Sequence, residues 1–143
     1  MQASGPIKVL LVSSDPDVLE TMKRALSSDS ISIVGEAWPG IESVRLASEM
    51  KPAVVLVHAE EPLGPAVNTV RSIGQAAPEA GLAVLSSLGD LDTIRRVMNA
   101  GAHDFATLPL GDDEIREATL RAYDAVNSSN TGDESAKSAT GTV

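Results

Sequence analysis

The side chains of this sequence that could do chemistry follow directly after short apolar runs. Ser13 and Ser14 come after one such run, and His58 comes after another. A serine beside a histidine can act as a nucleophile with its general base, provided that an acid orients the histidine. The G-x-S-x-G turn that exposes such a serine in many hydrolases is absent, and no orienting acid is evident. We therefore expect the two serines to cap the helix that follows them.

The acidic residues nearest to these positions are Asp15, Glu60 and Glu61, and together they could form a metal site. Each also has an ordinary structural interpretation. Asp15 precedes Pro16, which is typical of a helix N-cap followed by proline at the first helical position. The two glutamates lie in a loop rich in Pro and Gly. The sequence has no cysteine, and its glycines form no phosphate-binding motif. We predict no metal and no cofactor.

Five short apolar runs alternate with segments of helical spacing, and this alternation predicts how the polar side chains are positioned. Strictly alternating βα units favour a parallel sheet with helices on both faces, which is an α/β fold. In such sheets ligands bind beyond the carboxyl ends of the strands, where Ser13, His58 and Ser86 fall. The expected strands are Ile7–Val12, Ser30–Val34, Ala53–Val57, Leu82–Leu85 and Asp104–Thr107.

The segments between these runs carry apolar residues at helical spacing. Residues 60–65 are expected to form a loop before the third helix. In the fourth helix, Ile94, Val97 and Met98 are expected to face inward. The last helix opens with acidic residues, which favour a helix N-terminus, and its apolar stripe ends at Val126.

The chain has 143 residues, 43% of them hydrophobic, which favours one folded domain over a disordered chain. We divide it into a flexible arm (1–6), a domain (7–127) and a disordered tail or truncated linker (128–143). The formal net charge of −9 disfavours contact with nucleic acid or with an anionic membrane. The longest apolar runs are too short to span a bilayer, and no signal peptide is evident, so we expect a cytoplasmic protein.

Several segments resemble a CheY-like receiver domain of response regulators over the stretch from Ile7 to Val126. They are IKVLLVSSDPDVLETMKRAL, ISIVGEA with a glycine three residues later, KPAVVLVHAEEP, LAVLSSLGD and MNAGAHDFATLP. The resemblance implies a flavodoxin-like (βα)5 doubly wound fold, with a five-stranded parallel sheet in the strand order 2-1-3-4-5.

The resemblance also implies a phosphorylation pocket in which most of the family's charged residues are replaced. In the family, an acidic pair follows the first strand, a phospho-accepting aspartate ends the third, a Ser/Thr follows the fourth, and a lysine precedes the proline after the fifth. These positions fall on Ser13, Ser14, His58, Ser86 and Leu108. Ser86 keeps the family's residue type, and Phe105 takes the aromatic position that forms a switch with it. Mg²⁺ needs hard oxygen ligands, so we expect a degenerate pocket without phosphoryl chemistry.

His58 has three interpretations at the acceptor position. It could accept a phosphoryl group, it could sense pH because histidine titrates near neutrality, or it could fill the position as a partly buried neutral imidazole. We favour the last, because neither a metal-binding shell nor an activating lysine accompanies it.

The fourth helix, the fifth strand and the fifth helix resemble the family's output face, and they indicate a modest protein interface. Its candidate residues are Arg95, Arg96, Asn99, Phe105, Glu117, Arg121 and Asp124. We expect a protein partner or a second copy of the chain to bind there without phosphorylation. The domain would then be a regulatory or localising arm of a larger protein and not an enzyme. The alternatives are a receiver phosphorylated at a non-standard residue that controls a transcription effector, and a flavodoxin-like domain that binds a small ligand.

Two stretches point to different larger proteins. The stretch IRRVMNAGAHDFATLPLGDDEI is similar to the N-terminal receiver-like domains of Tad/Cpa-type pilus-assembly ATPases, in which such a domain serves localisation. The stretch IVGEAWPGIESV is similar to the receivers of helix-turn-helix transcription regulators. In both cases the effector would lie beyond Val143.

Overall fold

Five strands and five helices alternate through the described residues, 5–140, of the computed structural model. The elements are β1 (Ile7–Val12), α1 (Pro16–Ala25), β2 (Ile31–Ala37), α2 (Ile41–Met50), β3 (Val54–His58), α3 (Leu63–Ala76), β4 (Gly81–Ser86), α4 (Leu91–Ala100), β5 (Asp104–Thr107) and α5 (Asp112–Thr140). Each strand is followed by a helix, as the sequence predicts. The expected arm, residues 1–6, lies mostly outside the described residues.

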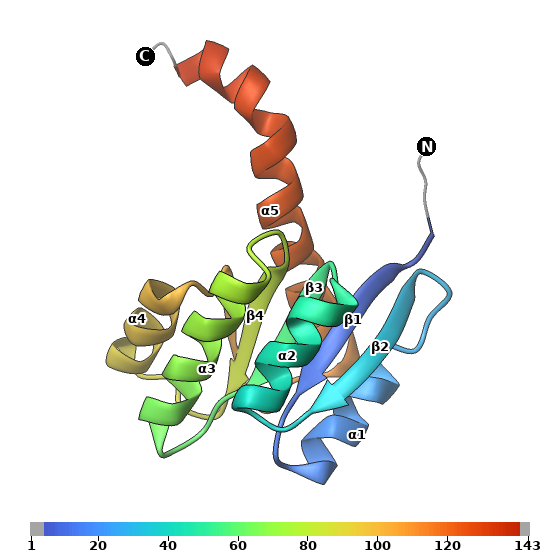
Figure 1. The fold of residues 1–143 in the computed structure, drawn as a ribbon, viewed down its shortest axis with the longest axis vertical. Coiled ribbons are helices and arrows are strands. Elements are labelled where there is room, and N and C mark those ends of the chain that lie inside the picture. The colour runs from blue at the N-terminus through green and yellow to red at the C-terminus, as the bar shows by residue number, and fades with distance from the viewer. Residues whose placement is uncertain (1–4, 141–143) are drawn as a thin grey trace.

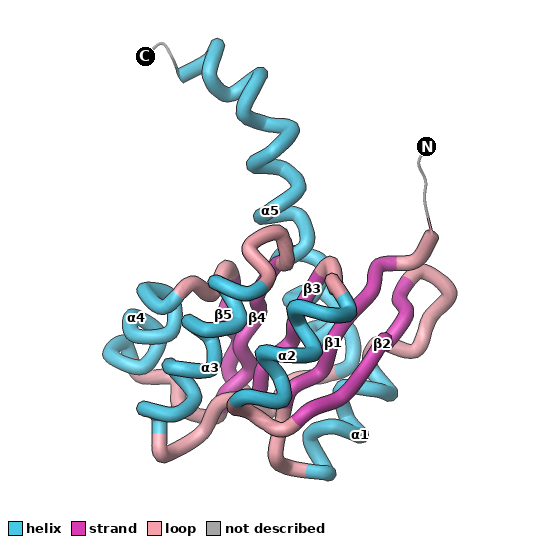
Figure 2. The backbone as a smooth tube through the Cα atoms, in the orientation of Figure 1, coloured by secondary structure: helices cyan, strands magenta, loops and turns pink. Residues whose placement is uncertain are grey.

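The strands form one parallel sheet in the order β2-β1-β3-β4-β5, which confirms the flavodoxin-like doubly wound fold. Helices α2, α3 and α4 cover one face of the sheet, and α1 and α5 cover the other (Figure 1). Because all strands run in the same direction, their carboxyl ends share one edge, the lower edge in Figure 1. Loops leave this edge and connect each strand to the helix that follows it (Figure 2).

Two apolar layers, one on each side of the sheet, form the core. Alternate residues of β3 point to opposite layers: Val55 and Val57 face the layer under α2, α3 and α4, whereas Val54 and Leu56 face the layer under α1 and α5. Every residue of β3 and β4 is buried. Their continuous apolar sequence is therefore that of strands covered on both faces.

Two boundaries at the carboxyl edge differ from the expected ones. β2 extends to Ala37, because Glu36 and Ala37 still pair with β1. α3 begins at Leu63, inside the expected loop of residues 60–65. Pro65 is tolerated there because the first turn of a helix leaves its N–H groups without intrahelical partners.

Two further differences concern α4 and α5. In α4 the buried positions are Thr93, Val97 and Ala100, so that Met98 is 39% exposed and the expectation that it faces inward is wrong. α5 continues to Thr140, through most of the segment 128–143 in which the sequence predicts a tail or linker. A helix closes its hydrogen bonds internally, and it can therefore propagate beyond its apolar face.

Candidate functional site

The carboxyl edge of the sheet brings together three of the predicted site residues. Ser13 follows β1, His58 is the last residue of β3, and Ser86 is the last residue of β4. β1 and β3 are neighbours, with Val12 paired to Val57, so Ser13 and His58 extend from adjacent strand ends. Their side chains meet in a buried hydrogen bond, with 3.0 Å between Ser13 Oγ and His58 Nδ1.

His58 also contacts Glu60, which the sequence analysis considered as a metal ligand or a loop residue but not as a partner of His58. Its Nε2 lies 2.9 Å from Oε2 of Glu60. The Glu60 carboxylate also accepts hydrogen bonds from the Ser87 amide at 2.9 Å and from the Ser87 hydroxyl at 2.6 Å. A carboxylate can only accept, so in the neutral imidazole Nε2 carries the hydrogen and Nδ1 accepts one from Ser13. The hydrogen-bond network Ser13–His58–Glu60–Ser87 thus joins the loops after β1, β3 and β4.

This hydrogen-bond network has the residue types of a Ser–His–acid triad, but Ser13 is not placed as a nucleophile. Ser13 is fully buried, and its Oγ also accepts the Asp15 N–H at 3.0 Å. A nucleophile needs space beside it for the atom it attacks. Asp15 caps α1, because its Oδ1 accepts from Asp17 N at 2.9 Å and Val18 N at 3.4 Å. The expected cap at Asp15 is confirmed, and the expected capping by Ser13 and Ser14 is wrong.

Three further predicted site residues pack within the domain and do not join this hydrogen bonding: Ser86, Phe105 and Leu108. Ser86 is buried, and its Oγ accepts the Leu88 N–H at 3.0 Å within its own loop. Phe105 is half-buried and packs on the apolar layer under α2, α3 and α4. Leu108 packs on the layer under α1 and α5. The hydroxyl of Ser86 is thus engaged locally, and Leu108 brings no charge to the edge of the sheet.

The resemblance implies Mg²⁺ at this edge, and the residues present do not fit it. Mg²⁺ takes oxygen ligands in near-octahedral geometry, usually with carboxylates among them. The Ser13 hydroxyl is committed to His58 and Asp15, both ring nitrogens of His58 are engaged, and the Asp15 carboxylate caps α1. Among the described residues, no group of three or more His, Cys, Asp or Glu side chains could hold a metal ion.

Glu60 makes the stability of the domain depend on pH. Its partial burial would raise the pKa of the Glu60 carboxyl, but the hydrogen bonds from Ser87 and His58 outweigh burial and lower that pKa below its usual value of 4.5. A lowered folded-state pKa stabilises the fold above pH 4.5. The contribution is lost as the pH falls through the folded-state value. We expect ionised Glu60 to contribute about 1 kcal/mol to the free energy of unfolding. The contribution is this small because the side chain is 32% exposed and solvent weakens its interactions.

The variant Glu60→Gln tests this contribution, since the amide keeps an acceptor oxygen and loses the charge. Near pH 7 the variant is expected to have the lower free energy of unfolding. Between pH 4.5 and the acid limit of folding, the difference from the parent protein is expected to shrink. Urea denaturation across this pH range measures it. A difference that stays constant across the range would show that ionised Glu60 does not stabilise the fold.

The predicted interaction residues lie on α4, β5 and α5, on both sides of the sheet edge that β5 forms. Six of them are exposed: Arg95, Arg96, Asn99, Glu117, Arg121 and Asp124. Arg121 forms a two-point ion pair with Asp104 of β5, at 3.2 and 3.0 Å, and so ties α5 to the sheet. Arg95 and Arg96 form no ion pair within the part of the chain that the structure describes.

The strand order and the polar carboxyl edge define a doubly wound α/β domain of the flavodoxin-like class. Within this class, the family model of the response regulator receiver domain matches residues 9–120, and the chain belongs to that family. The chain is 28% identical over 114 residues to the chemotaxis protein CheY of Listeria monocytogenes, covering 79% of this chain and 96% of that one. Other relatives are longer, and the chain spans about half the length of the probable C4-dicarboxylate response regulators DctR of Bacillus subtilis and Priestia megaterium.

Solved structures share the fold. The receiver domain of the putative response regulator NarL from Mycobacterium tuberculosis superposes with a TM-score of 0.76 at 22% identity, covering 84% of this chain and 98% of that one. A putative CpaE2 pilus assembly protein from Sinorhizobium meliloti superposes with a TM-score of 0.64 at 14% identity, covering 81% and 99%. At these identities the likeness shows the fold alone. In the described part of the chain, no helix has the length and apolar character needed to cross a membrane.

Proposed function

We propose that this receiver domain acts in the cytoplasm by binding a protein, and that it does so without being phosphorylated. The observation that carries the proposal is the hydrogen bonding of His58, the residue that the sequence resemblance assigns to the acceptor position. Both ring nitrogens are engaged, by Ser13 at 3.0 Å and by Glu60 at 2.9 Å, and the residue is 9% exposed. Phosphoryl transfer would need a free nucleophilic nitrogen and a cation to balance the transferred charge. The family's lysine position, Leu108, supplies no such cation.

The surface that supports protein binding is the α4–β5–α5 face, defined by the seven interaction residues named above. Arg95 and Arg96 lie on it together with the half-buried ring of Phe105. Arginine and aromatic side chains are enriched among the residues that dominate binding energies. Because the chain spans about half of the DctR relatives, we propose that the domain regulates or localises an effector on the same polypeptide. The occurrence of the fold in a pilus assembly protein makes localisation one form of this proposal.

Charge reversal at Arg95 is expected to weaken this association. Arg95→Glu should raise the dissociation constant about tenfold, for self-association or for binding to a partner, which corresponds to roughly 1.4 kcal/mol. Arg95 is exposed and unpaired among the described residues, so its replacement should change the free energy of unfolding by less than about 0.5 kcal/mol. Light scattering over a range of concentrations measures self-association, and pull-down from an extract of the source cells measures partner binding.

The control variant is Lys8→Glu, which makes the same charge change at an exposed position of β1, outside the α4–β5–α5 face. It is expected to behave like the parent protein. If Arg95→Glu also behaves like the parent protein in both measurements, this face is not the binding surface.

A further inference from the structure

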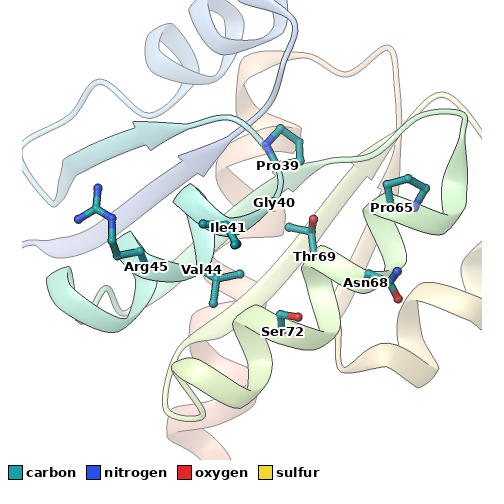
Figure 3. Close-up of a pocket in the computed structure, with 9 residues that line it drawn as sticks. All are labelled: Pro39, Gly40, Ile41, Val44, Arg45, Pro65, Asn68, Thr69 and Ser72. Carbon is teal, nitrogen blue, oxygen red and sulfur yellow. The ribbon is translucent and has the colours of Figure 1, made fainter.

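We propose that a groove between α2 and α3 binds a segment of a partner protein that carries basic side chains next to apolar ones. The groove shares no residue with the α4–β5–α5 face, and the proposal does not depend on the function proposed above. The groove has a volume of about 560 Å³ (Figure 3). Its apolar walls are Pro39, Ile41 and Val44 on the side of α2 and Pro65 on the side of α3.

Two large apolar side chains near the start of α2 are left exposed, and one of them lines this groove. Ile41, which lines it, is 85% exposed, and Trp38, in the loop just before α2, is 68% exposed. The core does not use them, because the buried positions of α2 are Ser43 and Ala47. A single exposed apolar residue is ordinary, but an exposed isoleucine that lines a concave surface is typical of a binding site, and the exposed Trp38 is next in the sequence to Pro39, which also lines it.

The polar groups of the groove are uncharged or already neutralised. Thr69 points from α3 toward α2, and Asn68 lies beside it, whereas the Arg45 side chain points away from the groove (Figure 3). The guanidinium of Arg45 is paired with Glu42 and Glu49, at 2.6 and 2.9 Å. The Asn68 side-chain oxygen accepts a hydrogen bond from Arg71 at 3.1 Å, and Thr69 is 5% exposed, so the group that Asn68 leaves for the backbone of a bound segment is its amide N–H.

An acidic hollow continues the groove toward the carboxyl edge of the sheet. This second hollow, of about 340 Å³, shares Pro39 and Pro65 with the groove and is also lined by Asp15, Glu60 and Glu61. Glu61 is exposed and forms no ion pair among the described residues. A lysine or arginine of a bound segment would therefore find unbalanced negative charge beside the apolar walls.

The negative charge of this surface also indicates which kind of molecule binds in the groove. The chain carries a formal net charge of −9, so a nucleic acid and a second copy of the chain would both bring more negative charge to an acidic surface. An apolar segment without cations would leave the acidic hollow unused. The occupant that satisfies both parts of the surface is a peptide segment with apolar and basic side chains.

A random peptide library displayed on phage, selected against the full chain, tests the proposal. The recovered sequences are expected to place Lys or Arg within a few positions of large apolar residues. Trp38 is the only tryptophan of the chain, so tryptophan-free synthetic copies of these peptides should change its fluorescence on binding. Ile41→Asp and Glu61→Arg are each expected to raise the Kd of these peptides about tenfold or more. Both residues are exposed, and circular dichroism melting verifies that the variants fold.

Leu91→Asp is the matched control, because Leu91 is 65% exposed on α4 and lies outside the groove. It is expected to leave the Kd unchanged. The proposal is overturned if no peptide is recovered, if the recovered peptides lack the basic and apolar pattern, or if Ile41→Asp and Glu61→Arg leave their binding intact. A concentration-dependent dimer that Ile41→Asp abolishes in light scattering would assign the groove to a second copy and would equally overturn it.

Discussion

Replacing Gly81 by alanine is expected to lower the free energy of unfolding by about 3 kcal/mol or more. Gly81 is the first residue of β4, and it lies against the backbone of α5. A Cβ atom at this position would overlap the carbonyl oxygen of Ala122 and lie 2.6 Å from its carbonyl carbon. Backbone atoms cannot rotate away as a side chain can, so α5 would have to shift from the sheet. Overpacking of this kind typically costs about 1–3 kcal/mol and occasionally more.

Gly74→Ala is the matched control for this prediction. Gly74 lies inside α3, and a Cβ there would be 3.6 Å from Leu82 Cδ1, an ordinary contact distance. Alanine in a helix interior is favoured over glycine by roughly 0.5–1 kcal/mol, so this variant is expected to be slightly more stable than the parent protein. Urea denaturation followed by circular dichroism measures both variants. Similar midpoints for the two would contradict the close packing of α5 on β4.

The second large effect is expected at Ser13. Ser13→Ala should lower the free energy of unfolding by about 2 kcal/mol, because it leaves His58 Nδ1 and the Asp15 N–H without the partner that both now share. Leaving a buried polar group unsatisfied costs about 1–3 kcal/mol. Nitrogen NMR of the imidazole should also detect the loss of the hydrogen bond at Nδ1 in this variant.

The neighbouring serine provides the control. Ser14 is exposed, and Ser14→Ala is expected to change the free energy of unfolding by less than about 0.5 kcal/mol. The sequence resemblance assigns both serines to positions that are acidic in the family. Comparing the two variants therefore separates the effect of the buried Ser13 hydrogen bonds from that of the exposed Ser14. Equal stability of the two variants would mean that the Ser13 hydroxyl does not hold His58 in place.

The fold could be predicted from local patterns. The apolar runs that became β1 and β3 are nearly the observed strands, and Asp15 before Pro16 marked the start of α1. Such signals depend on the types and spacing of residues close in the sequence, and both can be read from the sequence itself. The strand order came from the resemblance to receiver domains, since no local pattern determines which strands pair.

The site could be predicted only in part, because its contacts join distant residues. Ser13 and His58 could be placed at the same edge, but the role of Glu60 could not, because its loop folds back on His58 and bonds to Ser87 after the next strand. The two-residue spacing of His58 and Glu60 is the only sequence signal for this contact. Arg121 was predicted only as a residue of the interaction face, and its ion pair with Asp104, seventeen residues away, has no local sequence signal.

The central claim is that this receiver domain does not accept a phosphoryl group. The most direct test is the intact mass of the full chain after incubation with acetyl phosphate and Mg²⁺ at neutral pH, where phosphohistidine would survive. The CheY protein of Listeria monocytogenes, treated in the same way, serves as the comparison. We predict that the mass of this chain stays unchanged. An added phosphoryl group, on His58 or on any other residue, would contradict the claim.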